Sequence, residues 1–238
     1  MNYENPARRL LLILEEGKQL QPPLTCENAW IKLLGVNSSS LLLARLGKVI
    51  TLPADIMQTV QDLYPENIDI TAHWHPQVCQ MFTNLNLGNQ WSSHINLVDD
   101  NSMLQLKMTA MLLDNKLQSQ SLNDDAVDEI RQTFQELHDE VMGSEIKQEL
   151  KIFALRKLRE ILTNIDEYKL TGLLPILDAV DSSIGHYITN PDYRDFINEH
   201  SLGKRISAAL TATADSITIA TGLPVIAAAA KTLWLAVQ

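Results

Sequence analysis

The sequence predicts an all-α protein in which a multi-helix body is followed by a hydrophobic helix near the C-terminus. Apolar residues recur at helical spacing along most of the 238 residues, and no segment shows a convincing strand period. Residues 206–230 are almost free of charge, with Asp215 as the exception. We therefore expect three regions: an N-terminal helical domain, a helical hairpin for oligomerisation and signal sensing, and a membrane-spanning pore helix, at residues 1–118, 119–200 and 201–238.

Capping residues and turn residues divide the first region into short helices. Asn5 followed by Pro6 is typical of a helix start, and Gly17 is typical of a helix end. Thr25 predicts the start of a second helix, which we expect to end near Gly35.

The next predicted helices are also bounded by serine and proline. Serines 38–40 predict a third helix start, and Pro53 predicts that a further helix begins there and ends before Pro65. A less regular stretch is expected at 66–76, and a helix rich in Met and Leu at 103–117.

A polar segment at 118–125 marks the clearest internal boundary. Two amphipathic patterns follow it, with a break at Gly143, and together they predict a helical hairpin or an inter-subunit coil. Residues 170–184 predict a more hydrophobic helix, bent at Pro175. The apolar positions of the two amphipathic patterns are Ala126, Ile130, Phe134, Leu137 and Val141, then Ile146, Leu150, Ala154, Leu158, Ile161 and Ile165.

Composition narrows the classes of function. Aromatic residues make up only 5% of the chain, so aliphatic side chains must build the core. The formal net charge of -10 argues against non-specific duplex binding, which needs clustered Lys and Arg. The two cysteines, Cys26 and Cys79, form no CxxC pair, which favours a reducing cytoplasm over a disulfide framework.

No catalytic signature is present in the sequence. His73, His75 and Cys79 form the only metal-like cluster, but zinc needs three or four ligands in suitable spacings. We therefore predict no metal, no cofactor and no catalytic residue, and we do not expect an enzyme.

The apolar run at 206–230 predicts a transmembrane helix. At about 1.5 Å per residue it is long enough to cross a hydrocarbon core of about 30 Å. Lys204 and Arg205 precede the run and Trp234 lies near its end, which favours an inner-membrane location with the body on the cytoplasmic side. The alternative is a buried terminal helix, or two short helices broken at Gly222.

Polar residues in this run recur at helical spacing on one face. Intramembrane carboxylates usually face a bundle interior or an aqueous cavity, so this face predicts the lining of a cation-permissive pore in a homo-oligomer. The same face could equally turn to water on a soluble helix. The predicted pore-lining residues are Ser207, Thr211, Asp215 and Thr218.

Basic residues gather on the predicted helix that follows Gly143. Arg side chains suit phosphate, which indicates a site for an anionic ligand. The alternative is salt bridging with Glu145, Glu149 and Glu160 on the same helix. The candidate ligand-binding residues are Lys151, Arg156, Lys157 and Arg159.

The helical body and the tail from Lys204 to Val237 together resemble bacterial anti-phage membrane effectors, in particular the Hailong-type effector. This resemblance is architectural and rests on no diagnostic motif. It implies an oligomeric membrane channel controlled by a nucleotide signal such as single-stranded oligodeoxyadenylate, made by a partner nucleotidyltransferase. No signal-binding residue is carried over from the family. The other class that fits is a soluble helical adaptor or regulator whose tail packs in a core or partner interface.

Overall fold

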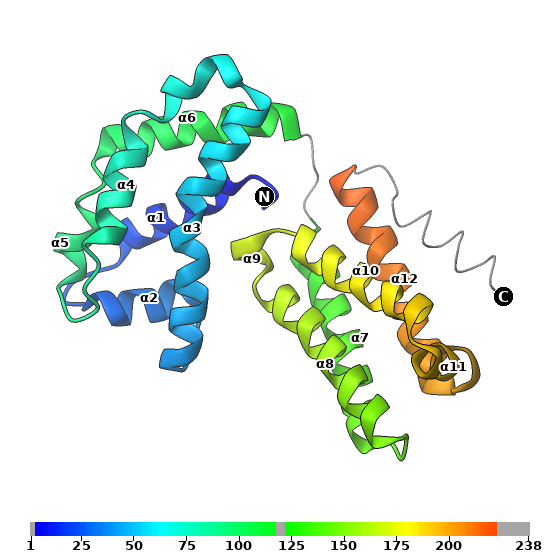
Figure 1. Ribbon diagram of the computed structural model, residues 1–238. Helices are drawn as coiled ribbons and strands as arrows, with labels where there is room; N and C mark the ends of the chain where they lie inside the picture. The colour runs from blue at the N-terminus through cyan, green and yellow to red at the C-terminus, as the bar shows by residue number, and fades with distance from the viewer. Residues whose placement is uncertain (1–2, 118–121, 223–238) are drawn as a thin grey trace. The chain divides into compact units, whose positions relative to one another are not determined.

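A computed structural model describes residues 3–117 and 122–222, with the side chain of residue 67 left out. Regular structure among these residues is helical throughout, which confirms the predicted all-α class. The contacts divide the chain into two compact units, Asn2–Gln118 and Ser119–Gln238. We call them the N-terminal unit and the C-terminal unit (Figure 1). The polar segment at 118–125 lies at this division.

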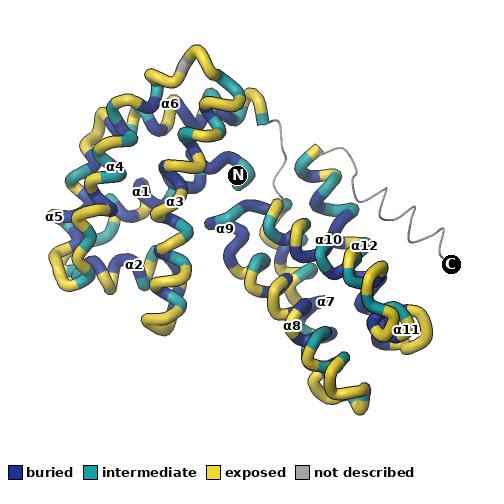
Figure 2. The backbone as a smooth tube through the Cα atoms, in the orientation of Figure 1, coloured by how far each residue is buried: buried dark blue, intermediate teal, exposed yellow. Residues whose placement is uncertain are grey.

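The N-terminal unit contains six α-helices and a 3₁₀ helix in its described residues. Helix α1 packs against α6, α3, α2 and α5, and the dark blue positions of Figure 2 follow its buried face. Leu10, Leu11 and Leu14 on this face are almost fully buried. The elements are α1 Pro6–Gln19, α2 Cys26–Leu34, α3 Ser39–Leu63, η1 Pro65–Thr71, α4 Trp74–Thr83, α5 Trp91–Ile95 and α6 Asp100–Leu117.

Asn5 both begins α1 and ties it to α6. Its side-chain oxygen accepts from the backbone N–H groups of Ala7 and Arg8, as a helix N-cap should. Its amide nitrogen donates to the carbonyl of Ala110 and to Asp114 of α6, both at 2.7 Å. Arg8 forms an ion pair with the same Asp114. The predicted helix start is therefore confirmed, and it also fixes the position of α6.

Gly17 does not end α1, contrary to the sequence prediction. The helix runs to Gln19, and Gly17 lies inside it, where a Cβ would come within 2.8 Å of Cζ2 of Trp91. The Trp91 indole N–H donates to the Gly17 carbonyl at 2.7 Å. The glycine allows the Trp91 ring to approach the α1 backbone.

Pro53 lies inside a helix, although the sequence predicted that a new helix begins there. Helix α3 is continuous from Ser39 to Leu63. A proline removes one backbone hydrogen bond, but the buried stripe continues on both sides of it through Val49, Leu52 and Ile56. Tertiary packing along this stripe accounts for the continuity.

The C-terminal unit is built on a helical hairpin, one of the two arrangements that the sequence indicated. Helices α7 and α8 pack along each other, α10 covers α8, and α12 packs against α7, α10 and α11. The predicted helix at 170–184 is instead two helices, because Gly172 has a φ of 81° between them and Pro175 lies in the first turn of the second. The elements are α7 Asp124–Gly143, α8 Gln148–Asp166, α9 Tyr168–Thr171, α10 Leu174–Thr189, α11 Pro191–Glu199 and α12 Ser201–Thr221.

Helix α12 forms part of the core of this unit. Its buried positions include Leu202, Ile206, Leu210 and Ile217. The helix ends at Thr221, and Gly222 follows in the left-handed conformation at a φ of 66°. The run predicted as one helix over 206–230 is thus interrupted at Gly222, and the prediction for residues 223–238 lies outside the described residues.

Candidate functional site

Basic and aromatic side chains meet where α8 and α10 pack antiparallel. Lys157 Nζ of α8 donates to Ser182 Oγ of α10 at 2.8 Å. One helical turn away, the Phe153 and His186 rings meet edge to face at 5.1 Å between centroids. We call these four residues, together with Arg156, the α8–α10 cluster.

Arg156 provides the accessible charge of this cluster. The side chain is exposed, and its guanidinium carbon lies 5.3 Å from the centroid of the Phe153 ring. A guanidinium held over a ring by a cation–π contact keeps its N–H donors at its edges. The geometry is suited to an anion with planar or phosphate oxygens.

Lys157 is more deeply placed than Arg156. Its side chain is only 9% exposed, and its ammonium also forms an ion pair with Glu160 at 3.0 Å. The pKa of nearby His186 is lowered, first by burial and then by the charges of Lys157 and Arg156. His186 therefore favours its neutral form, in which one ring nitrogen can accept a hydrogen bond.

The four predicted anion-binding residues do not converge on one site. Arg156 and Lys157 belong to the α8–α10 cluster, and Arg159 is exposed one turn further along α8. Lys151 instead donates to the Ser144 carbonyl at 2.9 Å, which closes the connection between α7 and α8. Lys157 and Glu160 form a local salt bridge on α8, which is the alternative that the sequence left open for the basic residues.

A small cavity of about 10 Å³ lies behind the cluster, which is room for roughly one water molecule. It is lined by Lys157 of α8, Ser183 of α10 and Tyr193 of α11, and by Ile206 and Leu210 of α12. Burial raises the pKa of Tyr193, so its phenol stays protonated. The buried end of the cluster and α12 therefore share one cavity.

The predicted pore-lining residues follow the edge of the buried face of α12. Ser207 is buried, and Thr211, Asp215 and Thr218 are half-buried. The Thr211 hydroxyl donates to the Ser207 carbonyl at 3.0 Å. The four predicted pore-lining residues thus lie along one edge of α12. In a single copy of the chain, this helix packs on α7, α10 and α11.

Sequence reasoning missed Phe153, Ser182 and His186 as members of the cluster. Arg156 and Lys157 stand out because they are basic residues on one predicted helix. The other three join only through the register between α8 and α10, in which Asn164 Nδ2 also donates to the Pro175 carbonyl at 3.0 Å. No local pattern reveals that register.

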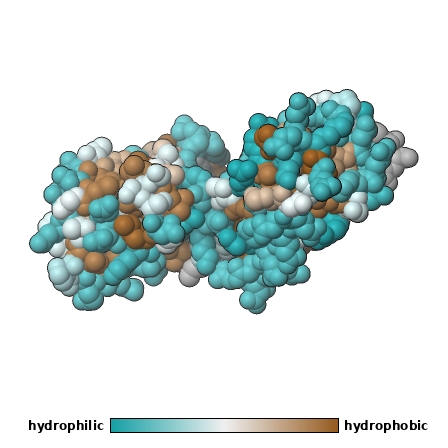
Figure 3. Space-filling model, turned by 90° about the horizontal axis from the view of Figure 1, so that it is seen from below, coloured by the Kyte–Doolittle hydropathy of each residue, from teal (hydrophilic) through white to brown (hydrophobic). Residues whose placement is uncertain are grey.

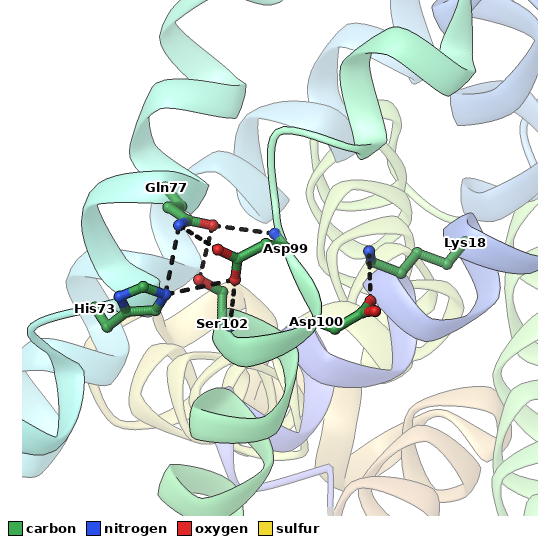
Figure 4. A network of polar contacts seen from close by, with 6 residues as sticks. All are labelled: Lys18, His73, Gln77, Asp99, Asp100 and Ser102. Atoms are coloured by element: carbon green, nitrogen blue, oxygen red, sulfur yellow. Dashed lines mark hydrogen bonds and ion pairs between the residues drawn. The ribbon is translucent and has the colours of Figure 1, made fainter.

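A second polar network lies between α4 and the start of α6 (Figure 4). Asp99 Oδ1 accepts from the Ser102 backbone N–H at 2.7 Å, which caps α6. Gln77 donates to Asp99 Oδ2 at 2.8 Å, and its carbonyl oxygen accepts from the Asp99 backbone N–H and the Ser102 hydroxyl. These bonds, with Gln77 the largest contributor, lower the pKa of Asp99.

This network contains a serine, a histidine and an aspartate, but it does not have the geometry of a catalytic triad. The Ser102 hydroxyl donates to Gln77, and the same His73 nitrogen, Nε2, lies 3.4 Å from both Asp99 and Gln77. In a triad the histidine contacts the acid and the nucleophile through different nitrogens. We interpret the network as a clamp between α4 and α6.

His75 and Cys79 lie one turn apart on α4, with Cys79 Sγ 3.6 Å from His75 Nε2. Burial raises the pKa of the Cys79 thiol and lowers that of His75. Within residues 3–117 and 122–222, no group of three His, Cys, Asp or Glu side chains is placed to hold a metal ion.

Within the part of the chain that the structure describes, no single helix combines the length and the apolar character needed to cross a bilayer. Helices α2 and α3 meet these criteria only as a pair, with a bend of 79° between them. No protein-family model, curated protein or solved structure matches this chain.

Proposed function

We propose that the protein is an oligomeric effector that binds an anionic signal at the α8–α10 cluster and acts on the inner membrane through its C-terminal region. One observation supports this proposal most: Lys157 lines the same cavity as Ile206 and Leu210 of α12. A ligand that draws Lys157 toward the surface would alter the packing of the helix that leads into the apolar tail. Under this proposal the signal acts by its differential affinity for two arrangements of α12.

The chemistry of the cluster favours a nucleotide or a short single-stranded oligonucleotide as the signal. Arg156 offers an exposed guanidinium group to phosphate, and the Phe153 ring lies beside it. Oligodeoxyadenylate from a partner nucleotidyltransferase is the specific signal that the family resemblance suggests. The effector would belong to an anti-phage defence, with its body on the cytoplasmic side.

The membrane part of the proposal rests on the sequence of 206–230 and on the polar edge of α12. In an open state, α12 would exchange its partners α7, α10 and α11 for copies of itself. Thr211, Asp215 and Thr218 would then line an ion path, with Ser207 at its end. Cations would be favoured there by a ring of Asp215 carboxylates.

A second candidate is a helical adaptor or regulatory protein, which the packing of α12 favours. Gly203 brings α12 into backbone contact with α11, since a Cβ at this position would lie 2.1 Å from the Phe196 carbonyl oxygen. A helix packed this closely is typical of a permanent core element. In that case the α8–α10 cluster would bind an acidic partner segment instead of a gating signal.

Membrane association is expected to depend on residues 223–238. A chain that ends at Gly222 keeps every buried residue of α12, whereas one ending at Gly203 would remove most of that helix. We expect the full chain to sediment with the inner membrane and to resist alkaline carbonate, and the chain ending at Gly222 to lose that association. Circular dichroism of the shortened chain controls for folding. If both chains are folded and both stay in the supernatant, the membrane function is rejected.

Signal binding is expected to depend on Arg156 more than on Arg159. Arg156→Gln removes the guanidinium that lies over Phe153, and we expect about tenfold weaker binding of short oligodeoxyadenylate, as for the loss of one charged hydrogen bond. Arg159→Gln is the matched control, because it removes the same charge from the same helix outside the ring contact. Fluorescence anisotropy of labelled oligonucleotide measures both. Identical losses in the two variants would indicate a general charge effect and reject the site.

A further inference from the structure

His186 is the one member of the α8–α10 cluster whose side chain titrates near neutral pH. Arginine and lysine side chains ordinarily lose their proton only far above neutrality, whereas imidazole does so at about pH 6.5. His186 is half-buried, and its ring is held edge to face against Phe153. Within residues 3–117 and 122–222, neither of its ring nitrogens forms a hydrogen bond.

The charges that surround His186 all lie on α8. Burial lowers the pKa of His186 most, Lys157 and Arg156 lower it further, and Glu160 raises it. From α11, Tyr193 lines the cavity behind the cluster, and burial keeps its phenol protonated. No other charged group among the described residues acts on this pKa. Two cations therefore outweigh one carboxylate, and the imidazole stays neutral in the free cluster.

A bound anion reverses this balance. Arg156 and His186 both contact the Phe153 ring, at 5.3 and 5.1 Å from its centroid, so that one ligand can reach both. Phosphate oxygens beside Arg156 bring negative charge to the same place, where a protonated His186 can donate a charged hydrogen bond to them. Binding and protonation then favour each other, and linkage requires the same factor in both directions.

The surface beside Arg156 also offers an apolar contact. Exposed apolar side chains occur in both units, as the brown areas of Figure 3 illustrate for one face. Ile152 is one of these side chains: it is 58% exposed and lies four residues before Arg156, on the same face of α8. A ligand that combines an apolar ring with phosphate uses both residues. A nucleotide therefore fits the cluster better than a bare inorganic anion does.

We propose that the α8–α10 cluster binds its nucleotide ligand together with one proton, which His186 takes up from solvent. This proton coupling rests on the proposed signal site and adds its regulation. The proton stays on the imidazole and is shared with a phosphate oxygen, and no bond of the ligand is broken. The affinity rises as the pH falls from above the pKa of His186 in the complex to below its pKa in the free cluster.

Binding measured at two pH values tests this coupling in the purified full-length protein. The probe is labelled oligodeoxyadenylate without a terminal phosphate, because its diester charges stay constant between about pH 5.5 and about pH 7.5. Fluorescence anisotropy is expected to show about tenfold tighter binding at the lower pH, as for one added charged hydrogen bond. His186→Gln is expected to remove this pH dependence. His138→Gln is the matched control, since it changes a histidine of α7 in the same unit outside the cluster.

Isothermal titration calorimetry in buffers of different ionisation enthalpy measures the proton itself. At about pH 6.5 the wild-type chain is expected to take up a fraction of one proton per bound ligand, and His186→Gln none. Equal affinity at both pH values, or the same pH dependence in His186→Gln, would overturn the proton coupling. In that case, binding that Arg156→Gln still weakens would leave the signal site in place. Wild-type protein without saturable binding at any pH would overturn the signal site and the coupling together.

Discussion

Replacing Gly203 with alanine is expected to destabilise the C-terminal unit by about 3 kcal/mol, at the upper end of what overpacking usually costs. The added Cβ would lie 2.1 Å from the Phe196 carbonyl oxygen and 2.7 Å from Ile197 Cα. Both are backbone atoms of α11, so no side-chain rotation relieves the contact. Either α12 moves away from α11 or the unit loses packing elsewhere.

Urea denaturation followed by far-ultraviolet circular dichroism measures this effect as a shift of the midpoint at constant slope. Gly185→Ala is the matched control, because that glycine lies within α10 and, apart from the adjacent backbone of its own helix, no atom lies within 4 Å of the position that a Cβ would take. The same substitution there is expected to stabilise by about 0.5 to 1 kcal/mol, from the better helix propensity of alanine. Wild-type stability of Gly203→Ala would show that α12 does not pack on α11 in this way.

The helix starts were predictable from sequence because caps act within one turn. Thr25 Oγ1 accepts from the Asn28 N–H at 3.2 Å, and Ser38 Oγ accepts from the Leu41 N–H at 3.3 Å. Asn123 begins α7 in the same way. Each signal lies within three residues of the bond that it predicts.

Three of the wrong boundaries involve glycine or proline. Gly17 and Pro53 lie inside helices, because a tryptophan from α5 packs against the first and a buried stripe passes through the second. Gly172 separates two helices where one was predicted, since its positive φ cannot continue a helix. Whether such a residue breaks a helix depends on distant partners, which a local pattern does not contain.

The residues of the candidate site could also be predicted only in part from local sequence patterns. The charges of Arg156 and Lys157 were recognised on one predicted helix, but Lys151, which the same pattern grouped with them, is used to close a turn. His186 lies 33 residues from Phe153 in the sequence, and only the packing of α10 on α8 brings the two rings together. Pairing between helices is set by tertiary contacts.

Replacing Trp74 with alanine is expected to destabilise the N-terminal unit by about 3 to 5 kcal/mol, as for other large-to-small changes in a core. The ring is fully buried between α4 and α6, and its Nε1 donates to Thr109 Oγ1 at 3.2 Å. Alanine would leave a cavity the size of the ring and the Thr109 hydroxyl without this donor. Urea denaturation measures the loss, with tryptophan fluorescence corrected for the missing ring.

Two further variants separate packing from hydrogen bonding at this position. Trp74→Phe keeps most of the buried ring and should cost much less than alanine, while Thr109→Val leaves the indole N–H buried without an acceptor and should cost about 1 to 3 kcal/mol. Thr109 lies on the buried face of α6, so both substitutions act within the same core. Equal losses of stability in Trp74→Ala and Trp74→Phe would contradict the packing of this ring in the core.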